Sequence, residues 1–353
     1  MAATDPGHRN PSTAPGLVSV VVAVRNEAAF IRETVASLLA QEQVLELLLI
    51  DGMSDDGTRE ILVNAAKSNP RLRVIDNPRR TAPYAFNLGI LAARGEYVAI
   101  FGAHAKYAPG YVATCIAELL KSGAAGCSGV LLTQPASDSA VARLVSAALS
   151  SRFGSSGNSV RTAREGFVDT IPFPLFRKDV LVEVGLYDVA LTRNQDNDMN
   201  QRLRAAGHKL YLTAKTSAVY YPKATLSGLA RHAYNAGLWN VMTARYKRGS
   251  MSLRHFVPLI FVIAVTLTAT LAVLPITGHG SPWWMMPFAI VAGAYGICAI
   301  LFSLQEVARQ RSSLMLALPI IFFLFHCSYG LGSLMGLLRG AKISTESQQK
   351  GLR

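Results

Sequence analysis

The sequence predicts an α/β domain with a mixed sheet, followed by a C-terminal helical region that enters a membrane. Within residues 17–225, short apolar segments alternate with segments whose apolar residues recur at helical spacing, which is typical of successive β-α units. Several apolar segments end abruptly in carboxylates, amides and glycines, as buried parallel strands do at the edge of a sheet. From Arg254 to Glu306, by contrast, no charged residue separates the two ends, which predicts membrane-spanning helices.

Composition and hydropathy divide the 353 residues into five expected parts. These are a disordered lead (1–16), the α/β domain (17–225), an interfacial amphipathic helix (226–254), a transmembrane region of about three spans (255–340) and a tail (341–353). The lead has no apolar segment of the kind found in signal peptides, and the four cysteines form no CxxC pair. We therefore expect the α/β domain on the reducing, cytoplasmic side of the inner or plasma membrane.

The first half of the α/β domain predicts four strands with helices between them. The strands are expected at 17–24, 46–50, 72–75 and 97–101, and the helices at 28–41, 58–67 and 82–93. The first segment is rich in valine and almost wholly apolar, which favours a central strand of the sheet. Thr58 opens the second helix and is its expected N-cap.

The second half predicts less regular structure. Helices are expected at 111–121, 141–149, 178–184 and 197–206, strands at 129–133 and 211–220, and extended chain over 167–176. A loop at 152–164 combines glycine, serine and arginine, which suits a segment close to an anionic ligand.

The C-terminal region predicts a helix at 226–246 and three spans at about 256–276, 283–304 and 314–338. The first connecting loop carries no charge and the second contains Arg309 and Arg311, so the distribution of positive charge places residues 1–255 in the cytoplasm. The basic tail conflicts with three complete spans, because they would place it outside. A bent or re-entrant third segment, which holds Pro319 and three glycines, is the alternative.

The net charge of +13 and the pI of about 9.8 indicate an anionic partner. A set of basic residues lies just before the apolar region: Arg231, Arg245, Lys247, Arg248 and Arg254. Such juxtamembrane clusters favour membrane lipids as that partner. No basic helix with interleaved aromatic residues and no zinc-finger spacing is present, so we expect no binding to nucleic acid.

Acidic residues follow two predicted strands in a way that suggests a binding site. Asp51, Asp55 and Asp56 follow the second strand, and Glu27 follows the first. Carboxylates at such an edge can accept hydrogen bonds from a base or ribose, or bind diphosphate through a divalent cation. The alternative for the three aspartates is a solvated turn with helix-capping residues, and Glu27 could simply favour a helix dipole.

Asp196 and Asp198 precede a helix that carries Arg202, and His104 ends the fourth predicted strand. A carboxylate beside a substrate hydroxyl can act as a general base, and a neutral imidazole can ligate a metal. The alternatives are acidic residues in the first turn of a helix for the pair, and a polar loop residue for His104.

Taken together, these segments resemble the family 2 glycosyltransferases with the GT-A fold, and among them the ExoA-like enzymes of succinoglycan and exopolysaccharide assembly. The resemblance covers roughly 17–248 and rests on VSVVVAVRNE, LLLIDGMSDDGT, the segment from Asn87-Leu88-Gly89 to Gly95-Glu96-Tyr97, and RNQDNDMNQRLRAAG. Each motif is weak alone, but the set in this order is specific.

The resemblance implies an inverting transfer in which Asp196 deprotonates the acceptor hydroxyl. Asp51 would then recognise the nucleotide base and Glu27 the ribose, while Asp56 supports the loop. Asp198 and Arg202 are expected to contribute to substrate binding. The implied donor is a nucleotide-sugar, with a UDP-sugar expected, and the implied acceptor is a lipid-linked glycan.

This sequence departs from the family pattern at the metal site. Gly102-Ala103-His104 stands where the family has Asp-x-Asp or Asp-x-His, so ligation of Mg²⁺ or Mn²⁺ would depend on His104, substrate phosphates and water. Gln195-Asp196 replaces the Glu-Asp pair of the base motif and keeps the base.

We therefore expect a membrane-anchored glycosyltransferase that adds a sugar to a polyprenyl-linked glycan in cell-surface or exopolysaccharide biosynthesis. A polyprenyl-phosphate sugar synthase is one alternative. The other is a catalytically impaired nucleotide- or sugar-binding partner of a polysaccharide assembly complex, which the Gly102 substitution would favour.

Overall fold

The computed structural model describes residues 18–103, 105–155, 161, 164–247 and 251–339. The chain forms two compact units. The first lies within residues 1–132 and 163–220, and the second within 133–162 and 221–353.

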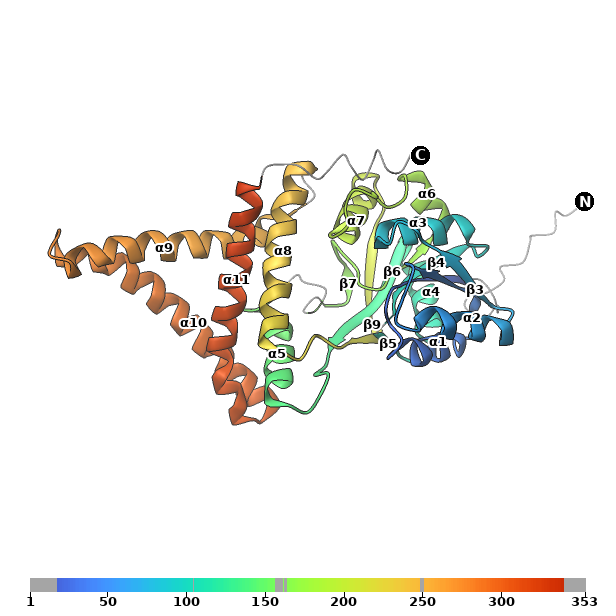
Figure 1. The fold of residues 1–353 in the computed structure, drawn as a ribbon, viewed down its shortest axis with the longest axis horizontal. Helices are drawn as coiled ribbons and strands as arrows, with labels where there is room; N and C mark the ends of the chain where they lie inside the picture. Colours follow the sequence, from blue (N-terminus) through green and yellow to red (C-terminus); the bar gives the residue numbers. More distant parts are fainter. Residues whose placement is uncertain (1–17, 104, 156–160, 162–163, 248–250, 340–353) are drawn as a thin grey trace, which may run out of the picture. The chain divides into compact units, whose positions relative to one another are not determined.

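The first unit is built on a sheet that contains nine strands among the described residues (Figure 1). The strands are β1 (Val18–Val24), β2 (Val44–Asp51), β3 (Leu72–Asp76), β4 (Tyr97–Gly102), β5 (Ala105–Tyr107), β6 (Gly126–Thr133), β7 (Gly166–Phe167), β8 (Leu175–Arg177) and β9 (Leu210–Tyr220). Their order is β3-β2-β1-β4-β8-β6-β9-β5, and β7 pairs with β9. The first four strands are parallel, and β8 runs antiparallel to β4. The predicted mixed α/β sheet is confirmed.

Helices cover both faces of this sheet, because the side chains on both faces of its central strands are mostly apolar and buried. The helices are α1 (Ile31–Leu39), α2 (Thr58–Ser68), α3 (Ala82–Ala92), α4 (Tyr111–Ser122), α6 (Lys178–Glu183) and α7 (Gln195–Ala205). Val20 and Val22 of β1 pack in one core with α1, α2 and α4, whereas Val21 packs in the other with α3, α6 and α7. Period-two alternation on a strand buried on both sides gives this division.

The second unit is helical. It comprises α5 (Ala140–Ser150), α8 (Leu226–Tyr246), α9 (Val257–Ile276), α10 (Met286–Gln310), α11 (Leu318–Leu338) and the short 3₁₀ turns η1 (Leu253–Phe256), η2 (Pro282–Met285) and η3 (Ser313–Ala317). Three of its helical segments, Leu253–Ile276, Pro282–Gln310 and Ser313–Leu338, are long and apolar enough to cross a membrane. We predicted α5 within the α/β domain, whereas its buried face packs with α8, α10 and α11.

Two local predictions were wrong. The N-cap of α2 is Gly57, with φ +91°, and Thr58 is the first helical residue. Glycine adopts this left-handed conformation without a steric penalty, so the turn forms one residue earlier than predicted. Residues 167–176 are not continuously extended but form β7 and β8 with irregular chain between them, where Phe173 has φ +44°.

Candidate functional site

The carboxyl ends of β1, β2, β3 and β4 lie at one edge of the sheet, because these strands are parallel and adjacent. Ligands of open α/β sheets bind outside this edge. Among the described residues, four non-glycine residues in the loops at this edge adopt positive φ: Asn26 (57°), Met53 (58°), Arg80 (58°) and Phe173 (44°). Such conformations are costly and concentrate at functional sites. The edge is therefore the candidate site.

Asp51 is the last residue of β2 and has no exposed surface. Its Oδ1 accepts hydrogen bonds from the Ser54 hydroxyl (2.6 Å) and the Ser54 backbone N–H (3.2 Å). Its Oδ2 accepts from Nη1 of Arg59 at 3.1 Å. A buried carboxylate requires such donors, so Asp51 holds the loop that leads into α2.

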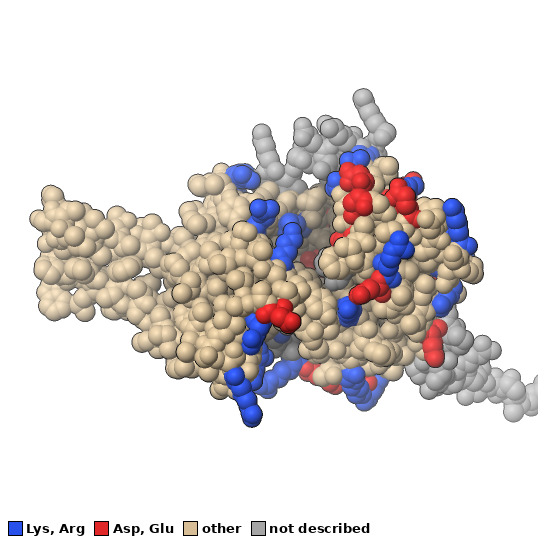
Figure 2. All heavy atoms as spheres, turned by 60° about the horizontal axis from the view of Figure 1, so that its bottom comes forward, with Lys and Arg blue, Asp and Glu red and all other residues tan. Residues whose placement is uncertain are grey.

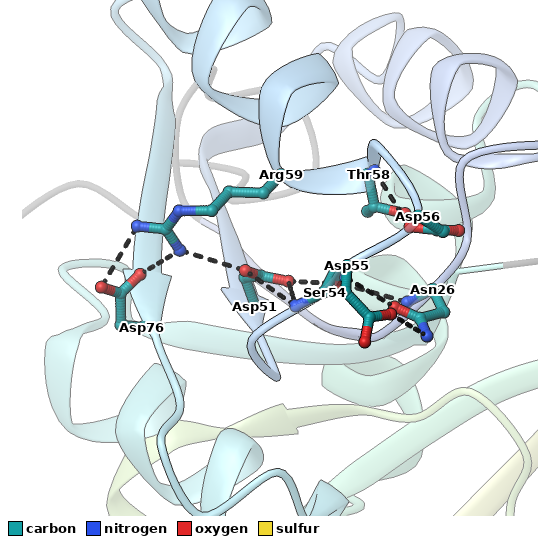
Figure 3. Close-up of polar contacts among 8 residues, drawn as sticks. All are labelled: Asn26, Asp51, Ser54, Asp55, Asp56, Thr58, Arg59 and Asp76. Atoms are coloured by element: carbon teal, nitrogen blue, oxygen red, sulfur yellow. Dashed lines mark hydrogen bonds and ion pairs between the residues drawn. The ribbon is translucent and has the colours of Figure 1, made fainter.

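Arg59 joins Asp51 to the end of the neighbouring strand (Figure 3). Its Nη1 and Nη2 donate to the two oxygens of Asp76, the last residue of β3, at 2.6 and 3.2 Å. The Asp76 and Arg59 side chains are 54% and 38% exposed, unlike that of Asp51. The pKa of Arg59 is raised, first by Asp76 and then by Asp51, so the guanidinium stays charged. The hydrogen-bond donor Arg59 and the acceptor Asp76 are thus both partly exposed to solvent, while Asp51, which binds Arg59, is buried.

The loops after β1 and β2 are joined by a second set of hydrogen bonds. Asn26 and Asp55 bond reciprocally, with Asn26 Nδ2 donating to Asp55 Oδ1 (2.8 Å) and the Asp55 N–H donating to Asn26 Oδ1 (3.1 Å). The Thr58 hydroxyl accepts from the Glu27 N–H at 2.8 Å and donates to Asp56 Oδ1 at 2.5 Å.

Asp56 completes this connection, because its Oδ2 accepts from the Ala28 N–H at 3.2 Å. The pKa of Asp56 is lowered, chiefly by the Thr58 hydroxyl, so the carboxylate that binds both loops stays ionised at neutral pH. Asp56 thus connects the loop after β1 to the start of α2, and its predicted role at a substrate site stays a prediction.

Asp196 lies in the first turn of α7 and is accessible to solvent. Protein packed around its carboxylate nevertheless desolvates it and raises its pKa. The hydrogen bonds that it accepts come from backbone N–H groups, including that of Asn197 at 2.8 Å. Asp196 therefore has the accessibility and the raised basicity that a general base needs.

The segment before α7 is held against α3 by Asn87. The Asn87 side chain donates to the Tyr187 carbonyl and accepts from the Tyr187 N–H, both at 2.8 Å. The Tyr187 ring packs on Phe86 of α3 at a centroid distance of 5.1 Å, and Asp196 is close enough to raise the pKa of Tyr187 further, after burial. Asn87 thereby positions the chain beside Asp196.

Asp198 and Arg202 bond to each other inside the protein. Asp198 has no exposed surface, and its Oδ2 accepts from Nε of Arg202 at 2.9 Å. The Arg202 guanidinium also donates to the carbonyls of Val184 and Leu186, both at 2.5 Å. These contacts fix α7 to the turn after α6, and the predicted substrate-binding role of both residues stays a prediction.

An aromatic cluster fills the space at the end of β4. A Cβ added at Gly102 would lie 2.9 Å from Cε1 of Phe173, and the Gly102 N–H donates to the Tyr107 hydroxyl at 2.8 Å. His104 lies outside the described residues. Within the described part of the chain, no three His, Cys, Asp or Glu side chains come together as metal ligands do.

Sequence reasoning found the acidic loop and Asp196 but missed Arg59, Asp76 and Phe173. The helical position of Arg59 and the surface character of Asp76 resemble ordinary solvated charges, so only the pairing of β2 with β3 brings them to Asp51. Phe173 reaches Gly102 across the antiparallel pairing of β4 with β8, which no local pattern encodes.

Comparison with known proteins shows which protein family this chain resembles. The family model described as "Glycosyl transferase family 2" matches residues 19–185. Succinoglycan biosynthesis protein ExoA from Rhizobium meliloti (strain 1021) is 30% identical over 260 residues, which cover 72% of this chain and 78% of that protein.

Two other similar proteins extend over almost the whole chain. The dolichyl N-acetyl-alpha-D-glucosaminyl phosphate 3-beta-D-2,3-diacetamido-2,3-dideoxy-beta-D-glucuronosyltransferase of Methanococcus voltae is 24% identical over 335 residues, covering 92% of this chain and 98% of that enzyme. The solved structure of the mannosyltransferase PcManGT from Pyrobaculum calidifontis, in complex with GDP-Man and Mn²⁺, has a TM-score of 0.55 at 18% identity and covers 93% and 89% of the two chains. This last likeness supports the fold.

Proposed function

The chain belongs to glycosyl transferase family 2, and from that premise we propose that it is an inverting enzyme that transfers a sugar from a nucleotide-sugar to a lipid-linked glycan. The observation that carries the proposal is the position of Asp196, an exposed carboxylate in the first turn of α7 that accepts a hydrogen bond from the Asn197 backbone N–H. Desolvation, which raises its pKa, agrees with the same role. Glycosyltransferase activity and the GT-A fold follow from the family.

The nucleotide would bind at the edge formed by β1, β2 and β3. Asp51 anchors this site, and its exposed partners Arg59 and Asp76 offer a donor and an acceptor to the edge of a base. Glu27, which follows β1 and is tied to α2 through Thr58, would accept from the ribose hydroxyls. Because the loops are fixed by hydrogen bonds before a ligand arrives, little ordering remains to be done on binding.

The transfer would be a single displacement. Asp196 accepts the proton of the acceptor hydroxyl as the oxygen forms its bond to the anomeric carbon. The bond from that carbon to the diphosphate oxygen breaks at the same time, and the nucleoside diphosphate leaves with the bonding electrons. Attack opposite the leaving group inverts the configuration.

A divalent cation is bound in the PcManGT complex and is the cofactor that the resemblance implies for this chain. The described residues do not fit it: position 102 has no carboxylate, Phe173 occupies the adjacent space, and no other cluster of ligands is formed among them. The displacement described above therefore uses only side chains of this protein, and the comparison of EDTA with Mg²⁺ and Mn²⁺ below tests for a metal ion.

The acceptor would be held at a membrane. The Methanococcus voltae relative is named for a dolichyl phosphate-linked sugar, and ExoA for succinoglycan biosynthesis. The helices of the second unit that are long enough to cross a bilayer support the same class of acceptor here, a polyprenyl-linked glycan reached from the cytoplasmic side. We propose a UDP-sugar as the donor.

The test is release of nucleoside diphosphate by the purified full-length protein in lipid. UDP-, GDP- and dTDP-sugars are supplied separately with membrane lipid extract, in EDTA, Mg²⁺ or Mn²⁺. We expect turnover with one class of donor, dependent on the lipid extract.

Transfer to polyprenyl phosphate alone would instead support a polyprenyl-phosphate sugar synthase. Nucleotide binding without turnover under every condition would overturn the proposal in favour of an impaired binding partner, which is the role that the loss of a carboxylate at Gly102 suggests.

A further inference from the structure

Helices α8 and α11 lie side by side in the second unit (Figure 1). Small residues allow their backbones to touch: a Cβ added at Gly332 would overlap the Tyr234 carbonyl, and one at Gly237 would overlap the Tyr329 carbonyl. The Asn240 amide donates to the Tyr329 hydroxyl, so a polar bond joins the same surfaces. Close contact through small residues makes the two helices one packed pair.

The two helices run in the same direction along this pair. Tyr234 meets Gly332, whereas Arg245, near the end of α8, donates from Nη1 to the Leu337 carbonyl at 2.7 Å, near the end of α11. Each helix has 21 residues, or about 31 Å at 1.5 Å per residue. If α11 crossed a bilayer, α8 would have to enter the hydrocarbon beside it.

Helix α8 is unsuited to hydrocarbon. Arg231 and His232 are exposed on its surface within the first two turns, and Arg245 is exposed near its end. Charged side chains inside a bilayer are costly and usually face a protein interior or a water-filled cavity. A helix with basic and aromatic residues is better accommodated in the interfacial plane.

The contacts of α11 with α9 also argue against a third span. A Cβ at Gly330 would overlap the Pro258 carbonyl and the Val262 side chain, and the His326 ring lies 6.4 Å from that of Phe261. Pro258 is the second residue of α9, whereas Gly330 lies twelve residues into α11, about 18 Å along its axis. Two helices that enter from the same surface in the same direction would contact each other at equal depths.

The hairpin of α9 and α10, unlike α8, is suited to the hydrocarbon of a bilayer. Figure 1 shows the two helices projecting from the α8–α11 pair, and the face of the projecting part seen in Figure 2 carries no charged side chain. The sequence has no Asp, Glu, Lys or Arg between Arg254 and Glu306. Apolar side chains such as Leu267 (65% exposed) and Ile290 (63%) are uncovered, and Trp283 (72%) lies at the tip, where an interfacial belt is expected. Both other ends are basic, with Arg254 before α9 and Arg309 near the end of α10.

We propose that the α9–α10 hairpin alone crosses the membrane, and that α8 and α11 lie together against the lipid headgroups on the side of the first unit. The basic residues of α8 and Arg339, at the end of α11, match an anionic lipid surface. Two crossings return the chain to its starting side. The basic tail is then on the cytoplasmic side together with the first unit, which removes the conflict that three crossings create. The proposal does not depend on glycosyl transfer.

The test is side-specific cysteine labelling in sealed vesicles. In the full-length protein with Cys298 and Cys327 replaced by alanine, single cysteines are introduced at Glu42 in the first unit, His279 at the hairpin tip and Leu338 at the end of α11. All three sites are exposed in the structure. A membrane-impermeant maleimide is then applied to right-side-out and inverted vesicles.

We expect Glu42→Cys and Leu338→Cys to react only in inverted vesicles, and His279→Cys only in right-side-out vesicles. If Leu338→Cys, like His279→Cys, reacted with the maleimide only in right-side-out vesicles, three crossings would be established and the proposal overturned. Reaction of all three on the inner side would show that the hairpin does not cross, and would overturn it equally.

A second measurement uses nitroxide labels at Ile320 and Leu331, which are 73% and 51% exposed on α11. Interfacial placement predicts that both labels have equal, shallow depths by collision with oxygen and with a water-soluble nickel complex. A label at Leu331 that is deep in the hydrocarbon while that at Ile320 is shallow would contradict it.

Discussion

Replacement of Asp196 by asparagine should separate activity from stability. The substitution keeps the size and the backbone hydrogen bonds of the side chain but removes its ability to accept a proton. General-base assistance contributes about 10²- to 10⁴-fold to a rate, or about 2.7–5.4 kcal/mol of activation free energy. We expect kcat to fall by that factor while the KM for the nucleotide-sugar changes little, since the nucleotide contacts proposed above do not involve Asp196.

The stability of the same variant should not fall. Desolvation raises the pKa of Asp196 in the folded protein above its unfolded value, so the ionised form is disfavoured by folding. The protonated carboxyl carries no such cost at low pH. The contribution of Asp196 to the stability of the folded protein is therefore lost as the pH rises through its folded pKa. At neutral pH the asparagine variant should therefore be as stable as the wild type or more so, and below about pH 3.9, the ordinary pKa of Asp, the difference should vanish.

The assays are steady-state kinetics and thermal melting of the protein in lipid, each measured against pH. The acid limb of kcat/KM for the wild type should lie above the pH that an ordinary Asp would give. Asp138→Asn, which changes an exposed carboxylate before α5, is the matched control and should alter neither activity nor melting. A kcat of the Asp196→Asn protein within a few-fold of the wild type would refute the role of Asp196 as the base. Weaker donor binding together with a lower melting temperature would indicate a structural role instead.

Three further variants test the rest of the site. Arg59→Leu leaves the buried Asp51 without its cation and should lower the unfolding free energy by about 1–3 kcal/mol and weaken donor binding, by melting and nucleotide titration; unchanged binding would exclude the pair from the site. Gly102→Asp should be tolerated only together with Phe173→Ala, which frees the space 2.9 Å from the new Cβ, and Mn²⁺ titration should show tighter binding in the double variant than in either single one. Asn87→Ala removes both hydrogen bonds to the Tyr187 backbone and should lower kcat more than it raises the donor KM; the reverse pattern would place Asn87 in donor binding.

The sheet was predictable from the sequence because its central strands are largely apolar on both faces and are followed at once by polar loops. Asp51 shows what such a pattern can and cannot reveal. Its position at the end of a strand was evident, but its complete burial depends on Arg59, which reaches it from α2 and is shared with β3. A contact made by three elements has no local sequence signature.

The site around Asp196 shows the same limit in another form. The acidic pair at the start of α7 was evident, yet the sequence treats Asp196 and Asp198 alike. The structure separates them, because Asp198 is buried against Arg202, whereas Asp196 is exposed and has its pKa raised by the protein packed around it. The difference arises from how α7 docks on α3 and α6, and this is a property of packing and not of spacing.

The apolar segments give a third case. Length and composition fit a span equally well for α9, α10 and α11, since each supplies at least about 30 Å of helix. What distinguishes α11 from the other two is its close backbone packing against the polar helix α8 and against the first turns of α9.

The configuration of the transferred sugar tests the central claim most directly. With the accepted donor and lipid-linked acceptor identified, the product is isolated and its anomeric configuration is read from the one-bond C–H coupling in its NMR spectrum. Direct displacement assisted by Asp196 predicts the configuration opposite to that of the donor. A product with the configuration of the donor would contradict the single displacement and, with it, the role of Asp196 as the base.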